Sequence, residues 1–202
     1  MTLHSLSISE VIPKVPVPSA HWSMVLSLSL AACAAPQPAK EADAPPTADS
    51  VMAVSWVLTP HAFGTVQIGW TVAQLNAALA DTLRPTYEIN DECDHLMPAA
   101  FPKGTSLMVI QDTAVRVDVF SPGILTPEGA GVGDTETRLR EIYGERAAVT
   151  PHKYTGPDGH YVTVMDTAAD SLHMTIFETD GDKVLQYRAG VAPGVQYVEG
   201  CA

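Results

Sequence analysis

The chain has 202 residues, enough for one domain or for two small units that share a core. Its composition, with 46% hydrophobic and 17% charged residues, is that of an ordinary soluble domain. The formal net charge of −12 argues against nucleic acid and anionic lipid surfaces as partners, because like charges repel. A basic partner, or none, fits this charge.

Residues 1–32 are interpreted as a lipoprotein-type signal peptide. Residues 25–32 form a short apolar run that ends in Leu-Ala-Ala directly before Cys33. This pattern resembles the lipobox of bacterial lipoproteins, whose cysteine is lipid-modified and becomes the N-terminus after cleavage. The run is too short to span a bilayer. Residues 1–23 contain only Lys14 as a cation, which departs from the positive start of a signal peptide, so the alternative is a chance Leu-Ala-Ala-Cys.

The residues after Cys33 are predicted to be a tether. Because Ala34 and not aspartate follows the cysteine, the resemblance implies an outer-membrane anchor, with the protein facing the periplasm or the outside. Residues 33–60 are rich in proline and alanine and cannot bury enough apolar surface to order themselves. Within them residues 51–58 form an apolar patch, which either docks as an edge strand or stays disordered.

Residues 61–202 are predicted to form the folded domain. Residues 63–69 alternate apolar and polar side chains, which is typical of a short strand. Thr71 is predicted to cap a helix, because Gln74 three residues later completes a capping box. Apolar residues then recur at helical spacing, at Val72, Leu75 and Leu79.

The strands that follow are predicted to pair in hairpins. Residues 107–110 and 115–119 alternate and are joined by a short turn. Residues 174–178 and 184–188 form a second hairpin, whose Asp180-Gly181 turn supplies the positive φ angles that such a connection needs. The remaining predictions are a strand at residues 161–165, a loop at residues 121–131 and an acidic turn around Cys93.

A second helix is predicted at residues 132–144, because this segment repeats the first helix start. At an offset of 64 residues from the segment 68–79 it shares three residues, Gly69 with Gly133, Thr71 with Thr135 and Leu75 with Leu139. Gly144 suits the left-handed position after a helix. The chain is therefore predicted to be a tandem repeat, with units at about 61–120 and 128–202. Each unit is a short helix plus antiparallel strands, and the predicted α+β fold is one sheet with both helices on one face.

Two cysteines remain once the predicted lipidation site is set aside. Cys93 and Cys201 lie in the predicted folded domain, and two such cysteines in an exported chain suggest one disulfide. The alternative, two free buried thiols, requires a reducing compartment. The predicted export of the chain out of the cytoplasm therefore favours the disulfide.

The densest polar cluster, at residues 151–161, is the candidate ligand-binding site. Its imidazoles, amine and phenol rings suit a sugar or an acidic ligand, and Trp70 is a further aromatic candidate. The alternative is a strand, turn and strand in which the tyrosines pack and the histidines lie at the rim. The candidate residues of the cluster are His152, Lys153, Tyr154, His160 and Tyr161.

The sequence lacks the usual patterns of metal, nucleotide and catalytic sites. His152, His160 and His173 do not stand at metal-ligand spacing, and Cys93 with His95 lacks the second pair of a structural zinc site. There is no Gly-x-Ser-x-Gly, and the glycine-rich residues 129–133 lack the lysine that would engage a phosphate. No cofactor, no metal and no catalysis are therefore predicted.

An ordered set of short motifs resembles a group of uncharacterised proteobacterial lipoproteins, some of which carry a lectin label. The motifs are Gly131-Val132-Gly133-Asp134, Tyr143-Gly144, Thr150-Pro151-His152-Lys153-Tyr154, Phe177-Glu178-Thr179-Asp180 and Tyr197-Val198-Glu199-Gly200-Cys201. Trp70 and Asp94 depart from the pattern, where methionine and an aromatic residue are usual. The repeat unit also resembles small outer-membrane assembly lipoproteins of the SmpA/OmlA kind, and its duplication resembles the β-lactamase-inhibitor-protein fold.

These features lead to three functional hypotheses. The first is an outer-membrane-anchored, non-catalytic binding lipoprotein whose partner is an envelope protein. The second is carbohydrate recognition through Tyr154, Tyr161 and Trp70, and the third is an envelope hydrolase, for which the sequence offers no nucleophile and base. The expected partners are the membrane, through the lipid, and an envelope protein or glycan, but no nucleic acid.

Overall fold

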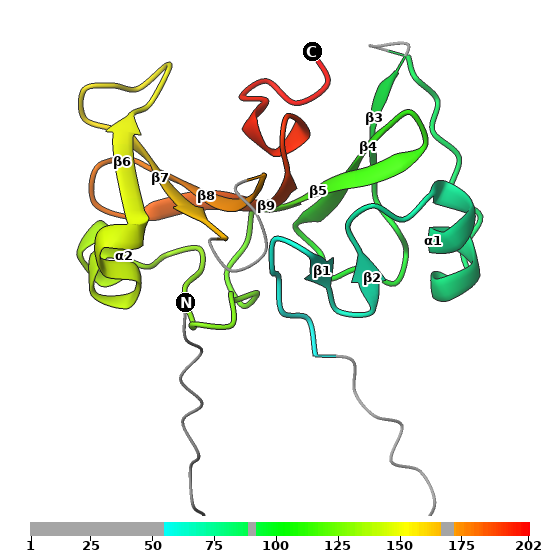
Figure 1. Ribbon diagram of the computed structural model, residues 1–202, viewed down its shortest axis with the longest axis horizontal. Coiled ribbons are helices and arrows are strands. Elements are labelled where there is room, and N and C mark those ends of the chain that lie inside the picture. Colours follow the sequence, from blue (N-terminus) through cyan, green and yellow to red (C-terminus); the bar gives the residue numbers. More distant parts are fainter. Residues whose placement is uncertain (1–54, 89–91, 167–171) are drawn as a thin grey trace, which may run out of the picture. The chain divides into compact units, whose positions relative to one another are not determined.

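The computed structural model describes residues 55–88, 92–166 and 172–202 of the chain (Figure 1). All of the described residues belong to one compact unit of the chain. The predicted signal peptide, Cys33 and residues 33–54 of the predicted tether lie outside the described residues. Within the part that is described, no helix has both the length and the apolarity needed to cross a membrane.

A seven-stranded antiparallel sheet, in the order β3-β4-β5-β9-β8-β7-β6, forms the centre of the domain. Neighbouring strands in this order pair antiparallel throughout. The strands β5 and β9 pair in the middle, so the first and last strand groups of the domain share one sheet. Their bounds are β3 Cys93–Leu96, β4 Thr105–Ile110, β5 Thr113–Val119, β6 Ala147–Pro151, β7 His160–Met165, β8 His173–Thr179 and β9 Val184–Val191.

Two helices, α1 (Val72–Leu79) and α2 (Glu136–Tyr143), accompany the sheet. The predicted α+β class, with an antiparallel sheet and two helices, is confirmed. The single strand predicted at residues 63–69 is instead a small hairpin, β1 (Ala62–Phe63) and β2 (Val66–Gln67), because Gly64 takes a φ of 57° and turns the chain.

The start of α1 follows from its sequence. The hydroxyl of Thr71 accepts a hydrogen bond from the Gln74 amide (3.3 Å), and the Gln74 side chain accepts one from the Thr71 amide (2.9 Å). This is the predicted capping box, and such a cap stabilises a helix by about 1 kcal/mol. In α2 the hydroxyl of Thr135 likewise accepts from the Arg138 amide (3.1 Å).

The end of α2 differs from the prediction. Gly144 has a φ of 56°, but its ψ of −131° lies outside the left-handed helical region. The helix α2 ends at Tyr143 with Gly144 as its C-cap, and the chain continues into the 3-10 turn η1 (Gly144–Arg146) and then into β6. The conformational freedom of glycine is used, but for a different bend from the one predicted.

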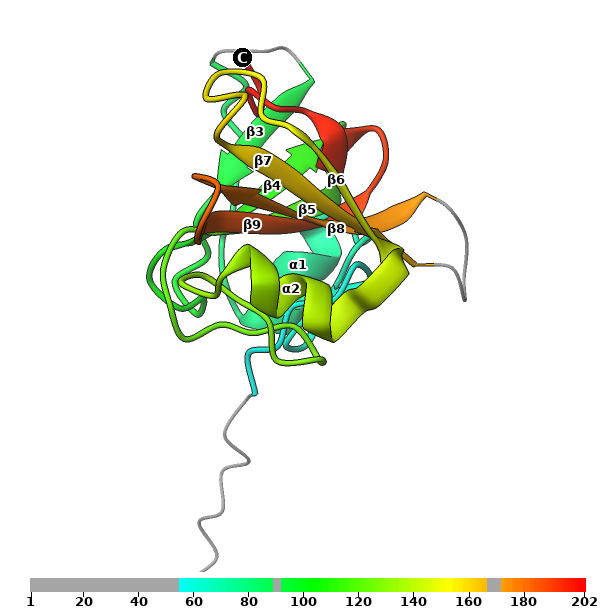
Figure 2. The ribbon, with the colours of Figure 1, turned by 90° about the vertical axis from the view of Figure 1, so that its left-hand side faces the viewer.

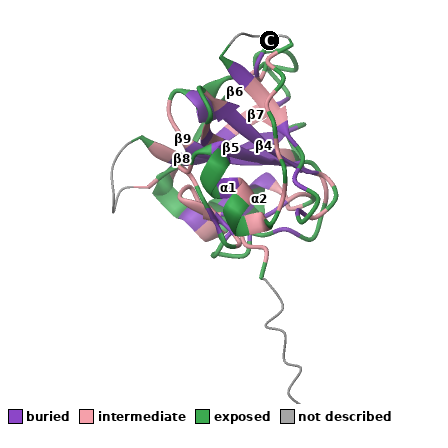
Figure 3. Cartoon of the chain, turned by 90° about the vertical axis from the view of Figure 1, so that its right-hand side faces the viewer, coloured by how far each residue is buried: buried purple, intermediate pink, exposed green. Residues whose placement is uncertain are grey.

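The two faces of the sheet carry different neighbours. On one face, alternate strand residues such as Leu107, Phe177 and Tyr187 pack in one cluster with Leu75 of α1 and Leu139 of α2. Figure 2 shows both helices on this side of the sheet. The opposite face carries the disulfide and the 3-10 turn η2 (Gly194–Gln196), whose Val195 packs in a separate cluster. In Figure 3 the strands between these layers are largely buried.

Two edge strands were missed by the sequence reasoning. Cys93, placed in an acidic turn, is the first residue of β3. The next residue, Asp94, has a structural role, because its carboxylate accepts hydrogen bonds from the amides of Thr86 (2.6 Å) and Tyr87 (3.3 Å). The strand β6 is mostly exposed and ends at Pro151, so it has no buried apolar alternation to predict it.

The last residues of the predicted tether belong to the folded domain. Trp56 packs against Phe63 and Phe101, with ring centroids 4.8 and 5.3 Å apart, and Leu58 is fully buried. Leu58 also forms an isolated bridge with Phe63. The described end of the apolar patch at residues 51–58 therefore docks on the core, since its side chains bury more apolar surface there than in a free tether.

Candidate functional site

The predicted polar cluster is divided between the two faces of the sheet. His160 Nδ1 lies 2.7 Å from Oε1 of Glu136, on the side of α2, and the hydroxyl of Thr179 donates to the same carboxylate. The next residue, Tyr161, packs with the cluster on the opposite face. Successive strand residues point to opposite faces, so His160 and Tyr161 cannot line one site.

His152 is held in place by its surroundings. Its Nδ1 accepts hydrogen bonds from the amides of Tyr154 and Thr155, both at 3.2 Å, and its Nε2 lies 3.3 Å from Oε2 of Glu178. Its ring stacks on Tyr161 with centroids 4.4 Å apart. Because Nδ1 accepts, the proton that points to Glu178 lies on Nε2. This histidine links a turn to the sheet.

Glu178 and Arg188 form a buried ion pair beneath this turn. The Arg188 guanidinium donates to the carboxylate and also, through Nε, to the carbonyl of Val195 (2.7 Å). Gln186 Nε2 donates to the same carboxylate at 2.6 Å. Burial alone would raise the pKa of Glu178, but the Arg188 charge and the hydrogen bonds from Gln186, Arg188 and His152 outweigh it, so this pKa lies below its ordinary value.

Lys153 and Tyr154 remain accessible. Lys153 Nζ lies 2.8 Å from Oε1 of Glu199, and the Tyr154 hydroxyl donates to the same oxygen. Tyr154 is 60% exposed. Tyr197, two residues before Glu199 in the sequence, is 42% exposed. The predicted motif around Tyr154 thus meets the C-terminal motif in space.

Lys153, Tyr197 and Glu199 line a hollow of about 470 Å³, which we call the C-terminal hollow. The predicted Cys93–Cys201 disulfide is confirmed and forms part of its wall. Its lining residues are Cys93, Lys153, Gln196, Tyr197, Val198, Glu199, Gly200, Cys201 and Ala202. The structure does not bring Trp70 to this surface, since Trp70 packs against the core cluster that contains the helices.

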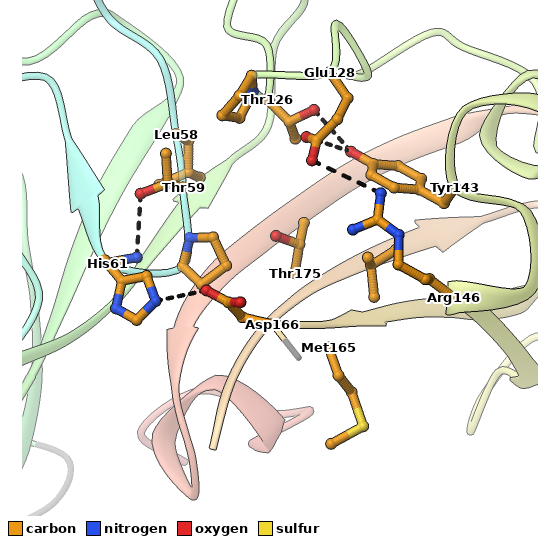
Figure 4. Close-up of a pocket in the computed structure, with 13 residues that line it drawn as sticks. Leu58, Thr59, His61, Thr126, Glu128, Tyr143, Arg146, Met165, Asp166 and Thr175 are labelled. Carbon is orange, nitrogen blue, oxygen red and sulfur yellow. Dashed lines mark hydrogen bonds and ion pairs between the residues drawn. The ribbon is translucent and has the colours of Figure 1, made fainter. Parts of the chain in front are cut away.

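A second pocket, which the sequence reasoning missed, lies on the helix side of the sheet (Figure 4). We call it the central pocket; its volume is about 330 Å³. Its wall is built from segments that lie far apart in the sequence. The lining residues are Leu58, Thr59, Pro60, His61, Thr126, Pro127, Glu128, Tyr143, Arg146, Val164, Met165, Asp166 and Thr175.

Polar side chains meet across the central pocket in pairs. His61 Nε2 lies 2.7 Å from Oδ2 of Asp166. The hydroxyl groups of Tyr143 and Thr126 are 2.7 Å apart, and the Tyr143 hydroxyl lies 3.4 Å from Oε2 of Glu128. Burial raises the pKa of Tyr143 to about 12, so its hydroxyl stays protonated and is a hydrogen-bond donor at neutral pH.

No local sequence signal marks the central pocket. Its polar residues come from separate segments, and none of them stands in a motif spacing with another. In the sequence, Tyr143 stands out only as a residue of the predicted helix 132–144 and of the Tyr143-Gly144 motif. The pairing of β5 with β9 brings these segments together, and that pairing has no sequence signature.

Two hydroxyl groups in the wall of the central pocket are already engaged within the protein. The Thr126 hydroxyl is bonded to Tyr143 and accepts from the Ala130 amide, and the Thr59 hydroxyl is used within its own turn. Within the described ranges, no three His, Cys, Asp or Glu side chains gather so as to hold a metal ion. Polar groups of this kind can orient a ligand through hydrogen bonds.

No protein-family model, curated protein or solved structure matches this chain.

Proposed function

We propose that this chain is a non-catalytic binding lipoprotein of the bacterial envelope, whose surface around the C-terminal hollow binds a protein partner. The observation that carries the proposal is the junction of Lys153 and Tyr154 with Glu199, beside the exposed Tyr197. Tyrosine is enriched at the energetic centres of protein interfaces, because its ring is large and its hydroxyl forms hydrogen bonds.

The construction of this surface supports the same proposal. The disulfide ties the C-terminal segment to β3, and Arg116 donates to the carbonyls of Tyr197 (2.6 Å) and Gly194 (3.3 Å). A segment fixed in this way loses little conformational freedom when a partner docks. The histidines proposed as ligand-binding groups are instead engaged with Glu178 and Glu136, which leaves the lysine and the tyrosines as the exposed contact residues.

The K153A/Y154A variant is expected to lose its partner. Two interface residues of the hot-spot kind contribute at least about 2 kcal/mol, so affinity should fall roughly 30-fold or more. The measurement is crosslinking and pulldown of the full-length lipoprotein from intact envelopes, with mass spectrometry of the captured proteins. The matched control is R138A/E141A, which removes another exposed ion pair (3.6 Å) on the outer side of α2.

One protein captured by wild type and the control, and lost in K153A/Y154A, supports the proposal. Equal capture by all three proteins contradicts it. Recovery of peptidoglycan or polysaccharide in place of a protein would favour carbohydrate recognition by Tyr154 and Tyr161, without Trp70.

The membrane anchor is a separate part of the proposal. We expect Cys33 to carry the lipid, so that C33A removes acylation and releases the protein from the outer-membrane fraction. Intact-mass analysis of the wild-type protein should show cleavage before Cys33 and the added acyl groups. A wild-type mass that corresponds to an unmodified chain would refute this assignment.

We also propose that the domain arose by duplication of a helix-plus-hairpin unit. In the first unit the amides of Gly69 and Val72 donate to Ala114 and Asp112, at 2.7 and 2.9 Å. In the second unit the amides of Gly133 and Glu136 donate to Val184 and Asp182, both at 2.9 Å. The β4–β5 hairpin shifts register at Met108/Val109 and the β8–β9 hairpin shifts at Glu178/Thr179, which are positions 70 residues apart. The central pair Asp118 and Arg188 has the same separation, as expected for a pseudo-twofold axis between the units.

A further inference from the structure

The wall of the central pocket includes a hydroxyl group to which no other described residue forms a hydrogen bond. Thr175 of β8 is only 6% exposed, and its side chain makes no hydrogen bond with the described residues. No side-chain nitrogen or oxygen that is sealed from solvent in these residues lacks a partner, so this hydroxyl opens into the pocket. Figure 4 shows it there without a bonded neighbour.

Thr105 of β4 occupies the position that corresponds to Thr175 of β8, 70 residues earlier in the chain. Its hydroxyl group does have a partner. Thr105 is also 6% exposed, but its hydroxyl donates to the carbonyl of Pro102 at 2.7 Å. An unpaired hydroxyl inside a protein costs about 1–3 kcal/mol unless it reaches water or a ligand. The open hydroxyl of Thr175 therefore requires a partner that enters the pocket, which is either water or a polar group of a ligand.

The central pocket also carries charges of both signs. The Arg146 guanidinium lies 4.0 Å from the Glu128 carboxylate, beyond hydrogen-bond distance, and over the ring of Tyr143. Its donors are therefore open to a ligand. Asp166 enters from the end of β7, and in Figure 4 Thr175 lies between Asp166 and Arg146.

This distribution of charge selects a class of ligand. An anion alone that reaches Arg146 meets the carboxylates of Asp166 and Glu128, and a cation alone that reaches them meets Arg146. A small molecule with both charges satisfies both sides. The volume of about 330 Å³ lies at the low end of small-molecule sites, and Leu58, Val164 and Met165 provide apolar wall for a short side chain.

We propose that the central pocket binds a small zwitterion, namely a free amino acid or a dipeptide. The ligand carboxylate pairs with Arg146, the ammonium group pairs with Asp166, and the Thr175 hydroxyl bonds a polar atom between them. This site is separate from the C-terminal hollow, and it does not depend on the proposed protein partner.

The test is calorimetric titration of the full-length protein with free amino acids and with dialanine, in both enantiomeric forms. We expect saturable binding by at least one of these zwitterions. The N-acetylated or C-amidated form of the same compound should bind roughly 10-fold more weakly or worse, because each lacks one charged end. The absence of saturable binding by any zwitterion, or equal binding of the blocked forms, would overturn the proposal.

Variants assign the binding to the central pocket. T175V keeps the shape of the side chain, so we expect unchanged or higher thermal stability and roughly 5-fold or greater loss of affinity. T105V is its matched control and should show the reverse, with lower stability and unchanged affinity. R146Q should weaken binding roughly 10-fold or more, whereas R138Q, outside the pocket, should not. Wild-type affinity in both T175V and R146Q would contradict the proposed site.

Discussion

Removing the Cys93–Cys201 disulfide is expected to lower the free energy of unfolding by about 4 kcal/mol in the chain-entropy model. The bond joins residues 108 positions apart, so it restricts a large part of the unfolded chain. The C93A/C201A variant also loses the covalent link that holds the C-terminal segment on the sheet. Urea unfolding of the full-length protein, followed by tryptophan fluorescence, measures the change.

Wild type treated with a reductant provides the control for this prediction. Its unfolding midpoint should shift in the same direction as that of C93A/C201A, and its intact mass should rise by two hydrogen atoms. The restored thiols replace a bond between two buried cysteines, so both proteins lose the same constraint. Coincident midpoints for oxidised wild type and C93A/C201A would show that the bond contributes no stability.

The second large effect is expected from Glu178. Replacing it with glutamine leaves the Arg188 guanidinium buried without its counter-charge, and removal of one partner of a buried ion pair costs about 3–5 kcal/mol. The amide of E178Q retains part of the hydrogen bonding, so we expect a loss of about 3 kcal/mol, at the lower end of this range. Chemical denaturation at neutral pH measures it.

Two further variants distinguish the ion pair from general disturbance. The double variant E178M/R188M replaces both charges with apolar side chains and should recover much of the lost stability. E141Q removes an exposed carboxylate and should unfold as wild type does. A double variant less stable than E178Q would contradict this explanation.

The same carboxylate makes stability depend on pH in a defined direction. The pKa of Glu178 is lower in the folded protein than its ordinary value of 4.5, because the Arg188 charge and the hydrogen bonds overcome the effect of burial. Its contribution is therefore complete above about pH 4.5 and is lost as the pH falls through the folded-state pKa. Wild type should lose more stability than E178Q over this acid range. Parallel curves of unfolding free energy against pH would refute the assignment.

The local elements of the fold could be read from the sequence because each depends on neighbouring residues. The capping box of α1 needs only Thr71 and Gln74. In the β8–β9 turn only Gly181 has the predicted positive φ (98°), while the Asp180 carboxylate accepts hydrogen bonds from the amides of Asp182 and Lys183. Both hairpins were predicted for the same reason. The edge strands β3 and β6 were not, since an exposed strand is specified by its pairing partner rather than by its own apolar pattern.

The candidate site was predicted only in part, because side-chain direction depends on strand register. His160 and Tyr161 are adjacent in sequence, yet they lie on opposite faces of the sheet. Lys153 and Tyr154 do share a surface, and both contact Glu199. Glu199 belongs to the C-terminal motif at residues 197–201, but nothing in the sequence links that motif to Lys153 and Tyr154.

The sequence by itself determined the two helix starts, the β4–β5 and β8–β9 hairpins, the α+β class and the choice of Cys93 and Cys201 as disulfide partners. The helix starts and hairpins depend on residue type and on short spacing along the chain, whereas the disulfide partners follow from the number of cysteines in the folded domain. Only the tertiary structure decided where Lys153 meets Glu199 and how Thr175, Arg146 and Asp166 come to line one pocket. The physical reason is that the strands in the order β9-β8-β7-β6 pair through backbone hydrogen bonds, which all residues can form, so this arrangement leaves little pattern in the sequence.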